Sequence, residues 1–348
     1  MKKVYGIVFG GMSFEHEISV VSAITLKKVL EGFDLRFLFV SAEREFYLIE
    51  ADNMKSTYFS KGEYKKAKKL TLGKGGFATG GLFGSKPVET DCIINLIHGG
   101  DGEDGKMASL FDFYGIPYIG PGIEASVLSF NKLYTKLYAK ELGVKTVDYQ
   151  LIRRGESYDL KFGFPVIVKP LRLGSSIGVS IVKEAGELEY ALDVAFEFDS
   201  EVLVEPFIQG VREYNLAGYR AGEHRLSIIE NPQKEEFLDF DKKYLDFSRD
   251  GKPAAADIPE ALAEAMRANF KTIYNTLFDG SLIRCDFFVI DDAVYLNEIN
   301  PIPGSMANYL FEDFQAAINE LGSNLPRKRT ITVDYLYINK IQSSKGKV

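Results

Sequence analysis

Apolar and polar positions along the chain predict a mixed α/β protein. Short, nearly continuous apolar runs at residues 4–9, 35–40 and 92–99 are typical of buried strands. Residues 17–30, which follow a Gly10-Gly11 turn, are predicted to form a helix. Strand, turn, helix and strand in this order form a βαβ unit, which implies parallel pairing. We therefore predict an open parallel α/β domain over residues 1–121.

The segment 41–90 interrupts this pattern. It has no sustained period and carries glycines at positions 73, 75, 76, 80, 81 and 84. We expect an irregular insertion that contains a hairpin.

Residues 122–208 predict a small central α+β domain. A helix over 131–143 ends at Gly143, a residue typical of the position just past a helix. Strands at 164–170 and 178–183 are joined by a Gly-Ser turn. A helix with apolar positions at 188, 191, 192, 195 and 196 precedes a strand at 201–208.

Residues 209–348 predict a larger α+β domain. Its regular elements are strands at 212–221 and 226–231, a hairpin at 282–304 and a long amphipathic helix at 262–277. Residues 231–253 are charged and aromatic without clear periodicity, so they form either a lid or a disordered loop.

The hairpin 282–304 carries more polar residues than a half-buried hairpin needs. Arg284 and Asp286 share a face, as do Glu298 and Asn300, because alternate residues of a strand point the same way. A three-residue loop would place Asp286 opposite Glu298 and Arg284 opposite Asn300. A two-residue loop would put the two pairs on opposite faces, since a one-residue slip flips every side chain. The sequence leaves both registers open.

Asp286, Glu298 and Asn300 could offer three oxygen ligands on one face. Mg²⁺ is usually held by one or two carboxylates together with waters and substrate phosphates. The alternative is a surface hairpin with exposed acids. Apolar residues flank these positions, however, and acids in an apolar setting need a counter-charge or a metal. We favour a magnesium–nucleotide site with Arg284 alongside.

Phosphate-binding motifs are few. The chain has no GxxxxGK[ST] motif and no complete GxGxxG after its first strand, so it is not a P-loop protein. The segment KPLRLGSSIG (169–178) offers backbone N–H groups and two hydroxyls that can form an anion-binding concavity, and Lys169 adds a positive charge.

Composition excludes several function classes. The chain has 348 residues, of which 46% are hydrophobic and 26% charged, as in soluble globular proteins. A net charge of -7 and one short basic run at 61–70 argue against nucleic-acid binding. Two cysteines cannot make a disulfide framework and are typical of a reducing cytoplasm. No apolar run approaches ~20 residues, and we interpret the N-terminus as a first strand, not a signal peptide. We expect a cytoplasmic protein without membrane insertion.

The order of several short motifs resembles the ATP-grasp ligases, and within them the D-alanine–D-alanine ligases. The motifs are GGMSFEHEIS (10–19), HGGDGEDG (98–105), NKLYTK (131–136), VIVKPLRLGSSIGVS (166–180), VEPFIQGVREY (204–214), KKYLDFS (242–248), RCDFF (284–288) and NEINPIPGS (297–305). The resemblance implies an ATP-grasp fold with a substrate-binding domain (1–121), a central subdomain (122–208) and a C-terminal subdomain (209–348) whose lid is 231–253.

The resemblance also implies how ATP and its metal ions bind. Two Mg²⁺ or Mn²⁺ ions would be bound by Asp286, Glu298 and Asn300. The implied nucleotide contacts are Lys132 and Lys169 to phosphates, Ser175 and Ser176 in a turn that closes over them, Glu205 and the backbone near Ile208 to adenine, and Glu213 to ribose. Pro206 has no N–H and can offer adenine only its carbonyl.

Roles toward the amino-acid substrates follow in the same way. Glu15 would contact the ammonium of the first D-alanine, with His98 near the same substrate and with Ser175 and Tyr244 completing a hydrogen-bonded link across the site. Lys243, Arg284 and the Gly304 N–H would lie at the reacting groups. Tyr309 and Leu310 would lie at the second D-alanine. Tyr309 departs from the family, which commonly has Ser there. Glu103 and Asp104 are interpreted as loop and cap residues.

The implied activity is ligation of two D-alanine molecules through a D-alanyl phosphate, for peptidoglycan precursors, by a homodimer. One alternative is a D-alanine–D-lactate ligase, which in the family goes with Phe rather than Tyr at position 244. Another is a nucleotide-binding regulatory protein on the same fold, which would have little need for the complete set of site residues.

Overall fold

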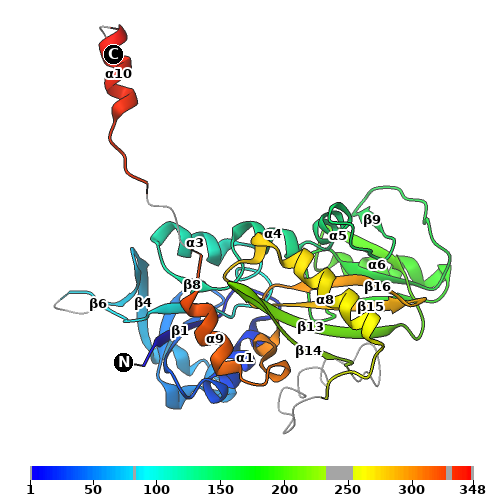
Figure 1. Cartoon of the computed structure of the whole chain (residues 1–348), viewed down its shortest axis with the longest axis horizontal. Coiled ribbons are helices and arrows are strands. Elements are labelled where there is room, and N and C mark those ends of the chain that lie inside the picture. The colour runs from blue at the N-terminus through cyan, green and yellow to red at the C-terminus, as the bar shows by residue number, and fades with distance from the viewer. Residues whose placement is uncertain (1, 81–83, 233–253, 327–330, 346–348) are drawn as a thin grey trace.

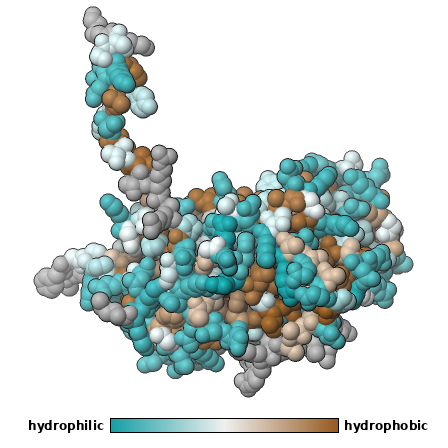
Figure 2. Space-filling model, in the orientation of Figure 1, coloured by the Kyte–Doolittle hydropathy of each residue, from teal (hydrophilic) through white to brown (hydrophobic). Residues whose placement is uncertain are grey.

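The computed structural model describes residues 2–80, 84–232, 254–326 and 331–345. Three sheets make up the body. The first lies at one end with β1 and β4, the second at the other end with β9, and the third between them with β13 and β15 (Figure 1). Hydrophilic residues cover most of the face shown in Figure 2. None of the described helices is long and apolar enough to span a bilayer.

The first sheet has eight strands in the order β6-β5-β4-β3-β2-β1-β7-β8. Their bounds are β1 Val4–Gly10, β2 Asp34–Val40, β3 Phe46–Ile49, β4 Lys68–Gly73, β5 Gly76–Thr79, β6 Lys86–Pro87, β7 Cys92–Asn95 and β8 Tyr118–Ile119. β2, β1, β7 and β8 pair in parallel, which confirms the βαβ prediction. The insertion is more regular than expected, because β3 to β6 extend the sheet with antiparallel strands. The helices of this part are α1 His16–Val29, α2 Ser56–Ser60 and α3 Lys106–Tyr114.

The second sheet has the order β11-β10-β12-β9 and is antiparallel. Its elements are β9 Gln150–Arg153, β10 Val166–Pro170, β11 Ser180–Val182, β12 Glu201–Pro206 and the covering helix α6 Leu188–Phe196. The predicted strands and helix are present. β9 is a strand that the sequence analysis did not predict.

The third sheet, β14-β13-β15-β16, is also antiparallel. Its elements are β13 Arg212–Ala221, β14 Glu223–Glu230, β15 Ile283–Ile290, β16 Ala293–Asn300 and α8 Glu260–Tyr274. Helices α4 Ile123–Phe130 and α5 Lys132–Glu141 pack in the core of this sheet, through Ala125 and Ala139. This packing brings the N-terminus of α5 to the end of β16.

After β16 the chain returns to the first sheet. The turn segment η6 Gly304–Leu310 and helix α9 Phe314–Ser323 pack in one core with β1 and α1 (Figure 1). Helix α10 Leu336–Lys345 projects away from the body (Figure 1). The end of the hairpin is therefore held against α1, about 280 positions earlier in the sequence.

Candidate active site

The hairpin β15–β16 turns over two residues, not three. Asp291 and Asp292 both have left-handed backbone conformations, with φ of 47° and 56°, and Ile290 pairs with Ala293. Two consecutive residues with positive φ are typical of the type I′ turn, which matches the twist of the strands.

A bulge then restores the polar face. The register shifts by one at Asp286, where Asn297 is an extra residue in β16. Asp286 therefore pairs with Glu298, and Arg284 with Asn300. The premise that a two-residue loop separates these pairs was wrong, because the bulge compensates for the shorter turn.

Asp286 is the centre of a charged group. Arg284 donates to it twice, from Nε to Oδ1 at 2.6 Å and from Nη2 to Oδ2 at 2.8 Å, and Asn300 Nδ2 donates to Oδ2 at 3.0 Å. Burial opposes the charge of the guanidinium, but attraction to Asp286 outweighs it and raises the pKa of Arg284. Two carboxylates and a carboxamide on adjacent strands suit a hard divalent cation, so these residues fit Mg²⁺ or Mn²⁺. In the described part of the chain, no group of three His, Cys, Asp or Glu side chains forms an alternative metal site.

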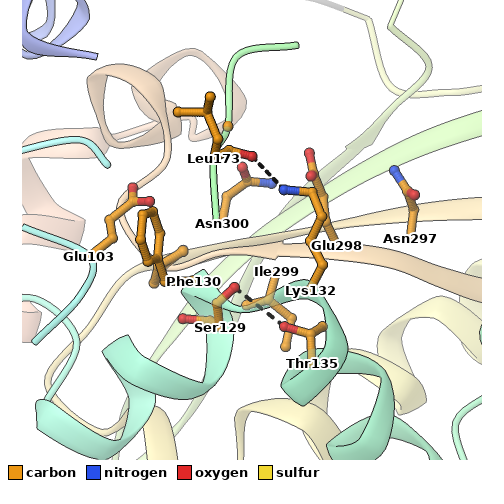
Figure 3. A pocket seen from close by; sticks show the side chains of 12 residues that line it. Glu103, Ser129, Phe130, Lys132, Thr135, Leu173, Asn297, Glu298, Ile299 and Asn300 are labelled. Carbon is orange, nitrogen blue, oxygen red and sulfur yellow. Dashed lines mark hydrogen bonds between the residues drawn. The ribbon is translucent and has the colours of Figure 1, made fainter. Parts of the chain in front are cut away.

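A pocket lies beside this face. Its lining residues are Glu103, Ser129, Phe130, Lys132, Thr135, Leu173, Gly174, Asn297, Glu298, Ile299, Asn300 and Pro301. Lys132, Glu298 and Asn300 gather on one side and Glu103 lies on the other (Figure 3). Lys132 Nζ donates to the backbone carbonyl of Leu173. Burial lowers the pKa of Lys132, although the carboxylate of Glu298 opposes this shift.

Buried Lys136 and partly buried Lys169 share one carboxylate next to the pocket. Glu205 Oε1 lies 2.8 Å from Lys136 Nζ, and its Oε2 lies 2.7 Å from Lys169 Nζ. Burial alone would raise the pKa of Glu205, but the two lysines outweigh burial and lower it to about 2. For Lys169, attraction to Glu205 overcomes burial and raises the pKa, whereas burial lowers the pKa of Lys136. Glu205 thus holds Lys169 charged and in place.

The carboxylate of Glu15 is enclosed by two glycine backbones. A Cβ added to Gly99 would lie 2.6 Å from Glu15 Oε2, and one added to Gly174 would lie 2.9 Å from Oε1. Ser175, at φ 59°, donates its hydroxyl to Oε1. Glu15 Oε2 is buried and has no hydrogen-bond partner among the described residues. Burial, followed by repulsion from Glu103, raises the pKa of Glu15.

Comparison with known proteins identifies the family of this chain. Residues 4–121 match the family model described as D-ala D-ala ligase N-terminus, and residues 138–321 match the one described as D-ala D-ala ligase C-terminus. The chain belongs to the D-alanine–D-alanine ligase family. It is 60% identical over 341 residues to a D-alanine–D-alanine ligase of Sulfurovum sp. (strain NBC37-1), covering 98% of this chain and 99% of the relative. A D-alanine–D-alanine ligase of Wolinella succinogenes is 60% identical over 98% of this chain and 99% of its own length.

Solved structures confirm the ATP-grasp fold that the motifs predict. The crystal structure of D-alanine–D-alanine ligase from Helicobacter pylori has a TM-score of 0.85 and 50% identity, and covers 94% of this chain and 100% of that chain. The D-alanine–D-alanine ligase family therefore supplies both the sequence and the structural relatives of this chain.

His98, which is predicted to lie near the first D-alanine, is held between Ser22 and Glu103. It is buried, its Nε2 is 2.9 Å from Ser22 Oγ and its Nδ1 is 3.8 Å from Glu103 Oε1. Burial lowers the pKa of His98 and raises the pKa of Glu103 to about 8. Glu103 lies in the loop before α3, as predicted, and it also lines the pocket.

The segment after β16 places Gly304, Tyr309 and Leu310. Burial raises the pKa of Tyr309 to about 12, and its charged neighbours are Arg284 and Glu230. The side chain of Leu310 packs in the core, so the predicted substrate contact by Leu310 requires its backbone.

Other predicted site residues are not among those that line the pocket, or they lie outside the described residues. Ile208 is partly buried beyond the end of β12, and Glu213 is on β13 opposite Phe288. Lys243 and Tyr244, with most of the predicted lid 231–253, lie outside the described residues.

Two residues that line or support the pocket had no predicted role. Lys136 is four positions after Lys132 on α5, so helical spacing could have placed both on one face. Glu103 had no comparable signal, because only the folded loop brings it opposite Glu298.

Proposed function

We infer that this chain joins two D-alanine molecules to D-alanyl-D-alanine with ATP, for peptidoglycan precursor synthesis. One observation carries the proposal beyond family membership, namely the partnerless oxygen of Glu15. A buried carboxylate oxygen needs a donor, and the ammonium group of an amino acid supplies one with the opposite charge. Ser175 fixes the other oxygen, so the carboxylate is held ready for this contact.

The reaction proceeds in two displacements. The carboxylate of the first D-alanine attacks the γ-phosphorus of ATP, and ADP leaves, giving an acyl phosphate. The amino group of the second D-alanine attacks the acyl carbon and loses a proton, and inorganic phosphate leaves with the bonding electrons. Negative charge develops first on the phosphoryl oxygens and then on the oxygen of the tetrahedral carbon.

The residues around the pocket suit these charges. Lys132 and Lys169 bind the nucleotide phosphates, next to the Ser175–Ser176 turn. Arg284 and the N–H of Gly304 face the developing charge, and each such fixed donor contributes ~3 kcal/mol to a transition state. Asp286, Glu298 and Asn300 would hold two Mg²⁺ or Mn²⁺ ions, which would neutralise charge on phosphate oxygens.

The remaining nucleotide and lid contacts are proposed on the family resemblance. Glu205, beside its role toward Lys169, and the backbone near Ile208 hold adenine, and Glu213 holds the ribose. Lys243 and Tyr244 close the site from the segment 231–253, which excludes water from the acyl phosphate.

The test is ADP release by the full chain with Mg²⁺ and ATP. We expect D-alanine to stimulate release and L-alanine not to, and we expect the dipeptide by mass spectrometry. Faster product formation from D-alanine plus D-lactate would favour the ester-forming relative, and no amino-acid-stimulated release would favour a regulatory protein. The matched variant Glu15→Gln keeps the acceptor for Ser175 but loses the charge, and we expect it to need at least about tenfold more D-alanine for the same stimulation while still binding nucleotide.

We also propose a cytoplasmic homodimer. The need for ATP supports the location, and the family resemblance supports the dimer. Light scattering of the purified chain measures its mass, and a monomer at working concentration would contradict the proposed dimer.

A further inference from the structure

Ser22 has no role in the proposed mechanism, yet its hydroxyl joins His98, which is predicted to lie near the first D-alanine, to the turn that leads to Tyr309, which is predicted to lie at the second D-alanine. It is fully buried on α1. It accepts the backbone N–H of Ser305 at 3.0 Å, and it lies 2.9 Å from Nε2 of His98. Since an N–H can only donate, the hydroxyl oxygen accepts from Ser305, and its own proton is available to a neutral His98. Burial disfavours the charged form of His98 and lowers its pKa.

The residue that Ser22 holds begins a strained turn. Ser305, Met306 and Ala307 have φ of 47°, 53° and 49°. Left-handed backbone is unfavourable for L residues, so three in succession persist only where the surroundings impose them. Within the segment, Met306 N donates to the carbonyl of Pro303 at 2.7 Å. The hydroxyl of Ser305 is buried without a partner among the described residues, so its backbone makes the link to α1.

We propose that Ser22 is a positioning residue for the second D-alanine. It holds the strained turn 304–307 and the His98 ring at a fixed separation, and this turn begins with Gly304 and leads to Tyr309. The inference rests on the proposed function. Apolar packing of η6 against α1 is independent of the hydroxyl, so removing the hydroxyl shifts the turn without exposing it.

Ser19 is a matched control on the same helix. It is equally buried, and its hydroxyl also makes two hydrogen bonds, accepting from Gly10 N at 2.8 Å and donating to the carbonyl of Leu96 at 2.6 Å. These bonds tie α1 to the first sheet and touch neither His98 nor the turn 304–307. Ser19→Ala therefore reproduces the loss of a buried hydroxyl without the positioning effect.

The experiment compares the unmodified chain with Ser22→Ala, Ser22→Thr and Ser19→Ala. ADP release is measured against D-alanine concentration at saturating ATP and Mg²⁺, with nucleotide affinity by titration and the thermal midpoint. We expect Ser22→Ala to raise KM for the second D-alanine about tenfold, because the turn that leads to Tyr309 is then misplaced. Nucleotide affinity should stay unchanged, Ser22→Thr should recover part of the KM, and Ser19→Ala should lower the midpoint without changing KM.

Three outcomes would overturn the inference. If Ser22→Ala and Ser19→Ala change the thermal midpoint and KM equally, Ser22 has only a structural role. A loss of nucleotide affinity in Ser22→Ala as large as its rise in KM for D-alanine would show that the substitution disturbs the whole site. No D-alanine-dependent ADP release by the unmodified chain would instead refute the proposed function, and the inference with it.

Discussion

Replacing Glu205 by Gln should destabilise the protein more than any replacement of one of its two lysine partners. The carboxylate lies 2.8 Å from Lys136 and 2.7 Å from Lys169, and the side chains of Glu205 and Lys136 are 4% and 2% exposed. With Gln at this position, two buried cations would share a neutral amide. With Lys136→Met, Glu205 still keeps Lys169.

The magnitude follows from the pKa of Glu205. A fall from 4.5 to about 2 corresponds to about 3 kcal/mol at about 1.4 kcal/mol per unit. Burial lowers the pKa of Lys136, so charging that lysine offsets part of this figure. Breaking a buried pair by removing one partner typically costs about 3–5 kcal/mol, and we expect Glu205→Gln to fall in that range.

The pH dependence has a defined sign. The folded-state pKa of Glu205 is below its unfolded value, so its stabilisation is fully present above about pH 4.5 and is lost as the pH falls toward 2. The difference in unfolding free energy between the unmodified chain and Glu205→Gln should be constant near neutrality and shrink in acid.

Urea unfolding followed by fluorescence and circular dichroism is the assay. The double variant Lys136→Met/Glu205→Gln removes one of the two stranded cations, so it should be more stable than Glu205→Gln by at least about 1 kcal/mol. Lys69→Met is the control, because Lys69 and Glu45 are also 2.7 Å apart but exposed, and such pairs contribute about 0–1 kcal/mol. Additive effects of the two buried substitutions would refute the reasoning.

Three further predictions concern the pocket. Glu15→Gln should raise KM for D-alanine at least about tenfold, because the charged partner of the ammonium is lost, and an equal loss of nucleotide affinity would contradict this. The pKa of Glu103 is raised to about 8, so the stability that its protonated form contributes is fully present below about pH 4.5 and is lost as the pH rises through 8. Between pH 5 and 8 the free energy of unfolding should therefore fall more in the unmodified chain than in Glu103→Gln. Parallel plots of unfolding free energy against pH for the two proteins would contradict this prediction. Asp286→Asn removes an anionic ligand and the partner of Arg284. The affinity for Mn²⁺, measured by electron paramagnetic resonance, should therefore fall at least about tenfold. An unchanged affinity would show that Asp286 does not bind the metal.

Elements with a clear period were predictable from the sequence. The run 4–9 became β1, and the helical spacing at 188–196 became α6 with the predicted bounds. The run 92–99 was too long as a strand, because β7 ends at Asn95 and the chain then turns so that His98 meets α1. In the insertion, weak alternation and many glycines concealed strands that depend on pairing with β2.

The hairpin shows the limit of local reasoning. Strand periodicity paired Arg284 with Asp286 and Glu298 with Asn300, but only the bulge at Asn297 made the two pairs face each other. A bulge depends on how both strands pack, and the residues of the turn do not predict it.

The amino-acid sequence by itself determined the elements with a clear period, the βαβ start and the residue types available for binding phosphate, metal and ammonium. These follow from hydrophobic period and side-chain chemistry, which act between near neighbours. Only the tertiary structure decided that Lys136 and Lys169 share Glu205, that Glu103 faces Glu298 across a pocket, and that Ser22 reaches Ser305. Such contacts join residues up to 283 positions apart, and they form because burying apolar faces of distant elements brings otherwise unrelated polar groups together, where each must find a partner.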